Sequence, residues 1–388
     1  MPVQILDHPT IHTLLISLPR EETTSLLHKI QQALESFSAH GERKNQPPPS
    51  AVTRPNTNTL FRPFTSATSV GTKITAEPVP DAHGKKAPLH GVIVLCDVAG
   101  LPTGLLASEE ITGYRTSMTA MVPFVWRRDV ADIVVFGAGV QALWHTRLIL
   151  MLRGDEVRRI TFVSPRRESV DELIRTVSNE NRVHGWTSTS TGGCVFDFVS
   201  SAASPSELET RLRTADCVFC TTPARNILFP AEYVTKRDTG TWPLVSAVGS
   251  WQSEMIELDP ALLHHAIDEN PSAGGQDMYT YNPITGQNKG AILTDDRDFA
   301  LGNCGEMVRA DVAREDVVEL GEIIALRKGR ETGESGSLSL AKVDGQRMDR
   351  FSEEGLVVFK SVGVSLTDLA AGNAVLDLFR LQRQLHRL

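Results

Sequence analysis

The sequence lacks several features that would reveal a class of protein at once. No stretch approaches the roughly 18 uninterrupted apolar residues of a membrane-spanning helix, so we expect no membrane partner. The N-terminus, MPVQILDHPT, lacks the charged region and apolar core of a secretory signal peptide. Aspartate and glutamate (47) outnumber lysine and arginine (39), and the net charge of −8 argues against a nucleic-acid-binding surface.

Cysteine is also scarce. Five scattered cysteines among 388 residues fit reduced thiols in the cytoplasm rather than a disulfide framework. Cys217 and Cys220 form a C-x-x-C pair in ADCVFCTTP, but this segment has the pattern of a buried strand, on which residues three apart face opposite sides. We therefore expect a cytoplasmic protein with no metal site.

What the sequence does contain is a regular alternation of strand and helix patterns from Ala131 onward. Short β-branched runs such as DIVVFGAG, RRITFVSP and CVFDFVSS alternate with helical patterns of about 10–15 residues. This alternation predicts an α/β fold, with a Rossmann-type, doubly wound parallel sheet over residues 128–325. The flanking residues 1–127 and 326–388 lack the alternation and are expected to form a second, discontinuous α+β domain.

The flanking segments have their own predicted elements. Apolar residues at helical spacing predict helical structure over 8–40, and Ser108 can cap a helix that ends near Phe124. The Pro- and Asn-rich stretch ERKNQPPPSAVTRPNTNT is expected to be a loop, whereas GTKITAEPV and HGVIVLCDV resemble strands. Ser365 and Asp368 form a capping pair at the start of a predicted C-terminal helix.

A glycine-rich turn follows the first strand of the alternating region. Gly137, Gly139 and Ala142 in VVFGAGVQALWH match the G-x-G-x-x-G/A pattern, and the turn lies between a strand and a helix as a dinucleotide site requires. The helix N-terminus would offer unpaired N–H groups to the phosphates, unless the turn is purely structural. The predicted cofactor site also includes Val140, Gln141 and Thr221.

The end of the next strand bears on which nicotinamide cofactor is bound. NAD sites usually have an acidic residue there for the ribose 2′-hydroxyl, but this strand ends in Ser164, Pro165, Arg166 and Arg167. Arginine can pair with a 2′-phosphate, which a carboxylate would repel. We therefore favour NADPH, with NADH as the alternative, and at least one of the two arginines can instead be a solvated loop charge.

At four blocks the chain resembles the ornithine cyclodeaminase/mu-crystallin family. The blocks are GTKIT, VIVLCDVAGLPTGLLASEEITGYRTSMTA running into VVFGAGVQALWH, SAVGSWQSEMIELD, and VVFKSVGVSLTDLAAGNAVLD. The resemblance implies a dinucleotide domain inserted into a second domain that carries the substrate pocket and a homodimer interface. It also implies hydride transfer between nicotinamide and the carbon that bears a substrate nitrogen.

The resemblance suggests three basic substrate residues. Arg115 shares a predicted helix face with apolar residues, where an unpaired charge would be very costly, so it needs an anion: a substrate carboxylate, or an internal one. The family match makes Lys73 a pocket lysine suited to carboxylate binding and proton transfer, although taken alone it looks like an outward-facing strand residue. The third residue is Arg54 or, at a position more often apolar, Arg62.

The main departure from the family is at Trp251. Ornithine cyclodeaminases have an aspartate there that acts as a base, and tryptophan cannot accept a proton, so we expect Trp251 to contact substrate instead. Val362 and Gly363 are expected to approach the nicotinamide, and His145 to be a packing residue. Glu257 and Asp259 match the family's E-L-D and are expected to be structural.

The sequence thus favours an NAD(P)H-dependent oxidoreductase that reduces a ketimine or imino acid, or interconverts an amino acid and its imine. Two alternatives stay open. One is an ammonia-eliminating lyase of the ornithine cyclodeaminase type, and the other is a non-catalytic, crystallin-like NADPH-binding protein. The substrate itself is not determined, because fold and motif define the reaction class but not the side chain that the pocket accepts.

Overall fold

The chain forms two compact units. The computed structural model describes residues 2–79, 87–188, 193–201, 204–237, 241–268, 280–332 and 343–385. One unit contains Met1–Arg115 with Val364–Leu388, and the other contains Thr116–Gly363. Within the described residues, no helix is long and apolar enough to cross a membrane.

The terminal unit is built on a six-stranded sheet in the order β1-β6-β5-β4-β3-β2. Neighbouring strands are antiparallel, except that β1 runs parallel to β6. Its strands are β1 (Gln4–Leu6), β2 (Ser50–Arg54), β3 (Thr57–Thr65), β4 (Ser69–Pro78), β5 (His90–Asp97) and β6 (Pro102–Ala107).

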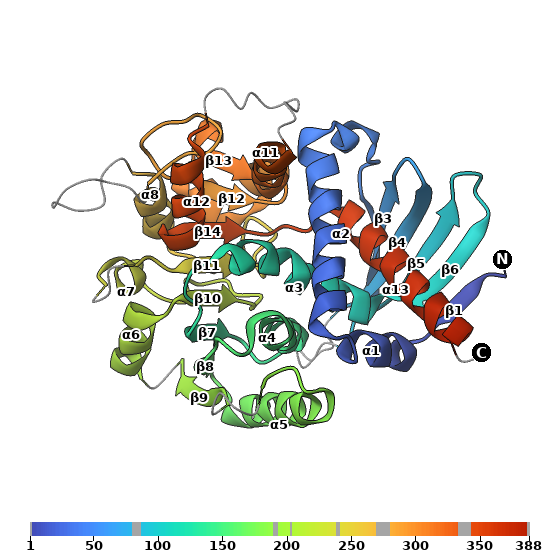
Figure 1. Ribbon diagram of the computed structural model, residues 1–388, viewed down its shortest axis with the longest axis horizontal. Coiled ribbons are helices and arrows are strands. Elements are labelled where there is room, and N and C mark those ends of the chain that lie inside the picture. The colour runs from blue at the N-terminus through green and yellow to red at the C-terminus, as the bar shows by residue number, and fades with distance from the viewer. Residues whose placement is uncertain are drawn as a thin grey trace. The chain divides into compact units, whose positions relative to one another are not determined.

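Helices pack against this sheet. The long helix from the C-terminus contacts β3, β4 and β5 and lies beside a long N-terminal helix (Figure 1). The helices of this unit are α1 (His8–Ile16), α2 (Arg20–Ala39), the 3-10 turn η1 (Glu42–Asn45), the start of α3 (Ser108–Trp126), and α13 (Ser365–Leu385). The predicted helical region over 8–40 is confirmed, but it is two helices, because Pro19 lacks an N–H and can only stand at the start of α2.

One loop prediction is wrong. The stretch ERKNQPPPSAVTRPNTNT contains β2 and the start of β3, joined by a tight turn at Pro55 and Asn56. All five residues of β2 are exposed, so the strand shows no apolar alternation in the sequence. Pairing with β3 forms the strand despite its loop-like composition, as tertiary context often does for β-structure.

The central unit contains an eight-stranded sheet in the order β13-β12-β14-β11-β10-β7-β8-β9, with every neighbouring pair parallel. This confirms the predicted Rossmann-type sheet. Its strands are β7 (Asp132–Phe136), β8 (Arg159–Ser164), β9 (Val195–Ser200), β10 (Cys217–Cys220), β11 (Leu244–Ala247), β12 (Ile292–Thr294), β13 (Val317–Glu319) and β14 (Val357–Lys360). Residues from β7, β10, β11 and β14 share one buried apolar core.

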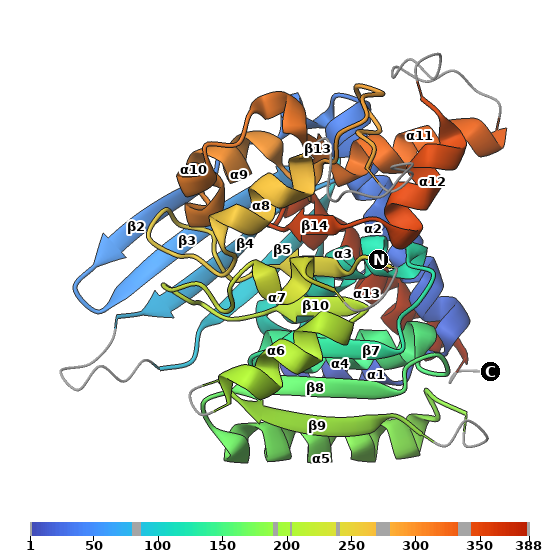
Figure 2. The ribbon, with the colours of Figure 1, turned by 90° about the vertical axis from the view of Figure 1, so that its left-hand side faces the viewer.

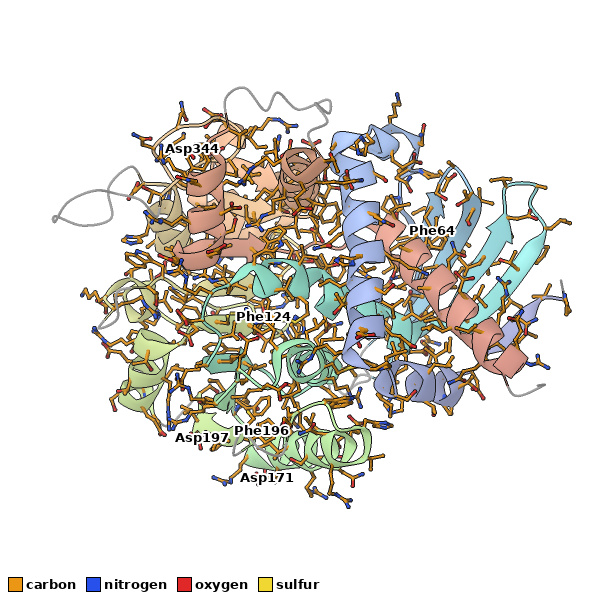
Figure 3. The ribbon with its side chains drawn as sticks, viewed as in Figure 1. Phe64, Phe124, Asp171, Phe196, Asp197 and Asp344 are labelled. Carbon is orange, nitrogen blue, oxygen red and sulfur yellow. The ribbon has the colours of Figure 1, made fainter. Side chains whose placement is uncertain are left out.

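Helices connect the successive strands of this sheet. Figure 2 shows β7, β8 and β9 side by side with one long helix next to β9, and Figure 3 shows Asp171 on that helix and Phe196 on β9. The helices of this unit are α4 (Val140–Arg153), α5 (Arg167–His184), α6 (Pro205–Thr214), α7 (Glu232–Thr235), α8 (Pro260–Ile267), α9 (Arg297–Asn303), α10 (Gly305–Ala310), η3 (Arg314–Asp316), α11 (Leu320–Thr332) and α12 (Gly345–Glu354).

The unit boundaries differ from the predicted domain boundaries near 128 and 326. Strand β14 pairs with β11 and β12, so the chain remains in the central unit until Gly363. The segment before β14 has no strand–helix alternation in its sequence, so the alternation alone predicts the end of the Rossmann-type domain too early.

Candidate functional site

The glycine-rich turn has the geometry that a dinucleotide site requires. Gly137 has a φ of +109°, and a side chain there would meet Thr221 Oγ1 at 2.8 Å. A Cβ built at Gly139, in contrast, would meet no atom of the described residues within 4 Å. The first glycine is therefore required by the fold, while the second leaves open space at the N-terminus of α4, where a pyrophosphate could approach the backbone.

Neighbouring residues support this turn in different ways. Ala142 is fully buried, as close helix–strand packing requires, whereas Val140 in the first turn of α4 is 60% exposed. Thr221 follows β10 and donates a hydrogen bond to the carbonyl of Phe136 at 2.6 Å. The chain runs from β7 outward to β8 and β9 on one side, and β10 and β11 lie on the other. The turn after β7 therefore stands at the topological switch point, where open α/β sheets bind ligands.

At the end of β8, the two arginines that the sequence predicts for a 2′-phosphate have different surroundings. Ser164 is buried, and its hydroxyl accepts a hydrogen bond from the backbone N–H of Arg166. Arg167 pairs with Asp171 at 3.6 Å and lies over the ring of Phe198. Arg166 is exposed at the N-cap of α5. Arg166 is thus the better candidate for a cofactor phosphate, and Arg167 is the better candidate for a surface ion pair.

Gln141 and His145 lie together on α4. His145 is fully buried, its Nδ1 lies 2.7 Å from the carbonyl of Gln141 and 2.9 Å from the hydroxyl of Ser117, and its ring packs against Phe219. Burial lowers the pKa of His145 to about 4, so the ring stays neutral near pH 7. These contacts agree with the prediction of a packing residue.

The loop after β14 is held by a buried carboxylate. Asp295 accepts hydrogen bonds from the backbone N–H groups of Val362 and Gly363, at 2.7 and 2.9 Å, and from the hydroxyl of Ser361 at 2.8 Å. Gly363 has a φ of +85°, so a residue with a side chain would be strained at this position. Burial raises the pKa of Asp295 despite the three donors. Asp295 therefore fixes the loop that we expect to approach the nicotinamide.

A second buried cluster supports the loops that follow β10 and β11. Glu257 accepts hydrogen bonds from the backbone N–H groups of Thr222, Gly249 and Ser250. Burial raises the pKa of Glu257 to about 7, although the nearby ammonium of Lys360 opposes the rise. This supports the structural role predicted for Glu257. Asp259 is structural as well, because it caps α8 through Ala261 N at 3.0 Å.

Lys360 lies at the centre of this cluster. Its ammonium donates to Ser250 Oγ at 2.8 Å and lies 3.3 Å from Glu306 Oε1 and 3.9 Å from Glu257. Burial lowers the pKa of Lys360, but the Glu306 carboxylate and its neighbours outweigh that effect and raise it. Ser250 in turn donates to Glu306. Trp251, the next residue, is 38% exposed.

In the terminal unit, three elements bring Lys73 and Arg115 together on one carboxylate. Lys73 from β4 donates to Asp368 Oδ1 at 3.0 Å and lies 2.8 Å from Oδ2. Arg115 from α3 donates through Nε to the same Oδ1 at 2.9 Å. The side chains of Lys73 and Arg115 are 4% and 5% exposed, and that of Asp368 is fully buried. The two predicted substrate cations therefore meet, and an internal carboxylate is one of their partners.

Burial and charge oppose each other at this cluster. Burial lowers the pKa of Lys73 to about 7, Asp368 opposes this change, and the positive charges of Arg115 and Arg62 add to it. For Asp368, burial alone would raise the pKa, but Arg115 and Lys73 outweigh burial and lower it. Lys73 can consequently exchange a proton near neutral pH while Asp368 remains ionised.

The structure distinguishes the two candidates for a third basic residue. Arg62 on β3 is directly opposite Lys73 on β4, and its charge acts on both Lys73 and Asp368. Arg54 is exposed at the end of β2, opposite Thr57. Since Thr57 and Arg62 are five residues apart on one strand, about 17 Å separates the position opposite Arg54 from the position beside Lys73. Within one chain, Arg62 rather than Arg54 belongs to the cluster.

The sequence patterns did not predict that Asp368 and Asp295 support the site. The pattern assigned Asp368 to the capping of α13, whereas its carboxylate is occupied by Lys73 and Arg115. A signal was present, because Asp368 lies within one of the four family blocks and in the buried first turn of a helix. Asp295 had no comparable signal, since TDD after a short strand is an ordinary helix start.

A Rossmann-type unit with a glycine-rich candidate dinucleotide turn, and a second unit with a buried Lys–Arg–Asp cluster, define a two-unit α/β protein. No protein-family model matches the chain. A Dictyostelium discoideum protein named as an uncharacterized cyclodeaminase is 28% identical over 290 residues, which are 71% of this chain and 75% of that protein.

Two solved structures have the same fold over almost their whole length. An archaeal alanine dehydrogenase dimer with bound NAD aligns with a TM-score of 0.69 at 16% identity, covering 99% of this chain and 98% of that one. The Thermococcus litoralis Δ1-pyrroline-2-carboxylate reductase, in complex with NADH and L-proline, aligns with a TM-score of 0.66 at 15% identity, covering 97% of both chains. These similarities show that the chain has the fold of these two proteins.

Proposed function

We propose that this protein is an NAD(P)H-dependent oxidoreductase that acts on a C–N bond, with an imino acid as the oxidised substrate and an amino acid as the reduced one. The observation that carries the proposal is the convergence of Lys73 and Arg115 from separate elements, both almost completely buried. Charged side chains are rarely fully buried unless they are paired, and perturbed ionisable clusters occur preferentially at functional sites.

The dinucleotide turn fits a nicotinamide cofactor. Gly139 and the first turn of α4 would hold the pyrophosphate, because a side chain at Gly139 would fill open space rather than contact the protein. Ser164 and Arg166 would bind the ribose end, and Thr221 and the loop at Val362 would lie along the rest of the cofactor. When bound, the cofactor supplies or accepts the hydride. The structural relatives with NAD and NADH support the cofactor class, and the preference for NADPH rests on Arg166.

The basic cluster would perform the binding and proton chemistry. Arg115 and Lys73 would attract the substrate carboxylate, with Arg62 as a third positive charge near it. Holding the carboxylate by two charged donors would orient the imine carbon for reaction, which is a large part of the catalytic gain in such enzymes. Lys73 would also supply the proton that the imine nitrogen requires, because its pKa of about 7 permits proton donation near neutral pH.

We also propose a cytoplasmic homodimer formed through the terminal unit. The archaeal alanine dehydrogenase to which the chain is similar is a dimer, and the family resemblance supports an interface in the corresponding domain. Light scattering at micromolar protein concentration would test this assembly, and a stable monomer would contradict it.

The function is tested by following NADPH oxidation with cyclic imino acids and with mixtures of a 2-oxo acid and an amine. Turnover that requires a substrate carboxylate supports the proposal, and the decarboxylated imine of the same ring size is the matched control substrate. Release of ammonia from ornithine would instead indicate a cyclodeaminase, the name carried by the Dictyostelium relative. Tight NADPH binding without turnover of any of these substrates would indicate a crystallin-like binding protein.

A further inference from the structure

Asp368 joins three parts of the terminal unit that are far apart in the sequence. It is 295 residues from Lys73 and 253 residues from Arg115, yet one of its oxygens accepts a hydrogen bond from each. A charged side chain that is completely buried is costly unless it is paired and hydrogen-bonded, and here both conditions are met.

The contacts restrict where the two cations can point. Lys73 Nζ is held between Asp368 and the hydroxyl of Thr112, which lies 3.4 Å away. Arg115 contacts Asp368 through Nε, the nitrogen nearest the side-chain stem. A hydrogen bond at Nε restricts how the planar guanidinium can turn, and so restricts the directions of its two terminal nitrogens.

We propose that Asp368 is a positioning residue that orients Lys73 and Arg115 toward the substrate carboxylate and keeps a proton on Lys73 for transfer to the substrate nitrogen. This inference rests on the proposed function for the identity of the substrate. In the reductive direction, a bound reduced nicotinamide would supply the hydride to the imine carbon, and Lys73 Nζ would donate the proton to the imine nitrogen. The resulting neutral amine of Lys73 regains its proton from water.

The charges around Lys73 give Asp368 a distinct electrostatic role. The groups that face Lys73 are Asp368 from α13, Arg115 and Thr112 from α3, and Arg62 from β3, while the residue opposite on β5 is the apolar Ile93. Burial, Arg115 and Arg62 all lower the pKa of Lys73, and Asp368 raises it. Replacing the Asp368 carboxylate by an amide would therefore remove the group that favours the ammonium form.

The first experiment compares the pH dependence of kcat/KM for the wild type and Asp368→Asn. Lys73 must be protonated to act, so activity should fall as the pH rises through its pKa of about 7. In Asp368→Asn this alkaline limb should move to lower pH by about one unit or more, the effect of losing an adjacent opposite charge. Asp377→Asn is the matched control, because Asp377 is an exposed carboxylate on the same helix, and its profile should equal that of the wild type. An equal loss of activity at every pH would overturn the proposal.

A second readout needs no turnover. Because Lys73 loses its proton on folding between its native and unfolded pKa values, the unfolding free energy rises with pH in that window. The rise should begin at a lower pH in Asp368→Asn than in the wild type. If no substrate is ever turned over but this shift is found, the proposed function fails while the electrostatic part of the positioning role stands. If turnover is found without either shift, the positioning role fails while the function stands.

Asp368→Asn could fail to fold because it leaves two buried cations with a neutral partner. Asp368→Glu then tests the same proposal, since it retains the charge but moves the carboxylate by one methylene. The expected result is a near-normal alkaline limb with a kcat lowered by roughly tenfold or more, because the pKa is preserved while the orientation is not. A wild-type kcat in Asp368→Glu would overturn the positioning role.

Discussion

Replacing Lys73 by methionine should change the pH dependence of stability by an amount that can be worked out from the structure. The Lys73 side chain is 4% exposed, and its pKa falls from 10.5 to about 7, chiefly through burial. In the window between these values the unfolded chain binds one more proton than the native protein. The unfolding free energy of the wild type should therefore rise by about 1.4 kcal/mol per pH unit from this residue.

The sign of the effect can be checked at both ends of the window. Below about pH 7, both states carry the protonated lysine, so the cost of burying the charge is present in full. Above pH 10.5 neither state carries the proton and the cost is absent, so the stabilisation is complete at high pH and is lost as the pH falls toward 7. Methionine does not titrate, so Lys73→Met should lack this contribution.

Chemical denaturation of both proteins from pH 7 to 9 measures the difference directly. Over these two units the wild type should gain roughly 2 kcal/mol relative to Lys73→Met, because Lys73 is half-protonated at its pKa of about 7 and the full slope is reached only above it. Titrating groups far from Lys73 cancel because both proteins contain them. Replacing Lys29, a lysine 43% exposed on α2, by methionine is the control and should give parallel curves. Parallel curves for Lys73→Met as well would show that Lys73 titrates normally, and the argument for its role as a proton donor near neutral pH would fall.

Three further predictions concern binding and specificity. Arg166→Ala should weaken NADPH binding by about 10–100-fold and NADH binding hardly at all, as expected for a lost charge-assisted hydrogen bond. Arg167→Ala should have a smaller effect, because Asp171 already pairs with that residue. Fluorescence titration with both cofactors tests this, and a wild type that prefers NADH would contradict it. Arg62→Ala should raise KM for the imino acid more than Arg54→Ala does, and steady-state kinetics giving the reverse order would show that the cross-strand position is not decisive. The wild type should release no ammonia from ornithine, because Trp251 cannot serve as a base, and a coupled ammonia assay that detects release would refute that reading.

The buried cluster around Lys360 shows how the central unit holds its loops from the inside. Lys360 and Glu257 both lie in family blocks, but their contacts are with Ser250, Glu306 and the backbone of the loops after β10 and β11. A lysine that is buried and surrounded by two carboxylates is neutralised inside the protein. Lys360 therefore contributes to the site by making these loops rigid, and Thr221 and Trp251 lie on them.

The sequence by itself determined the parts of this protein that depend on local patterns. The alternation of strands and helices predicted the parallel sheet, and Gly137, Gly139 and Ala142 predicted the tight turn between β7 and α4, because the spacing along one strand–turn–helix segment fixes that geometry. The apolar helix face around Arg115 predicted that this cation needs an anionic partner, since an unpaired buried charge is too costly in any fold.

Only the tertiary structure decided what depends on contacts between distant segments. It showed that Arg62 rather than Arg54 adjoins Lys73, because strand register and not sequence spacing sets cross-strand neighbours. It joined β14 to the central sheet across more than 100 residues from β11, and it formed β2 from a stretch with loop-like composition. It also showed that Asp368, an apparent helix cap in the sequence, is the partner of Lys73 and Arg115. The packing of α13 against β3, β4 and β5 brings its first turn to these two cations.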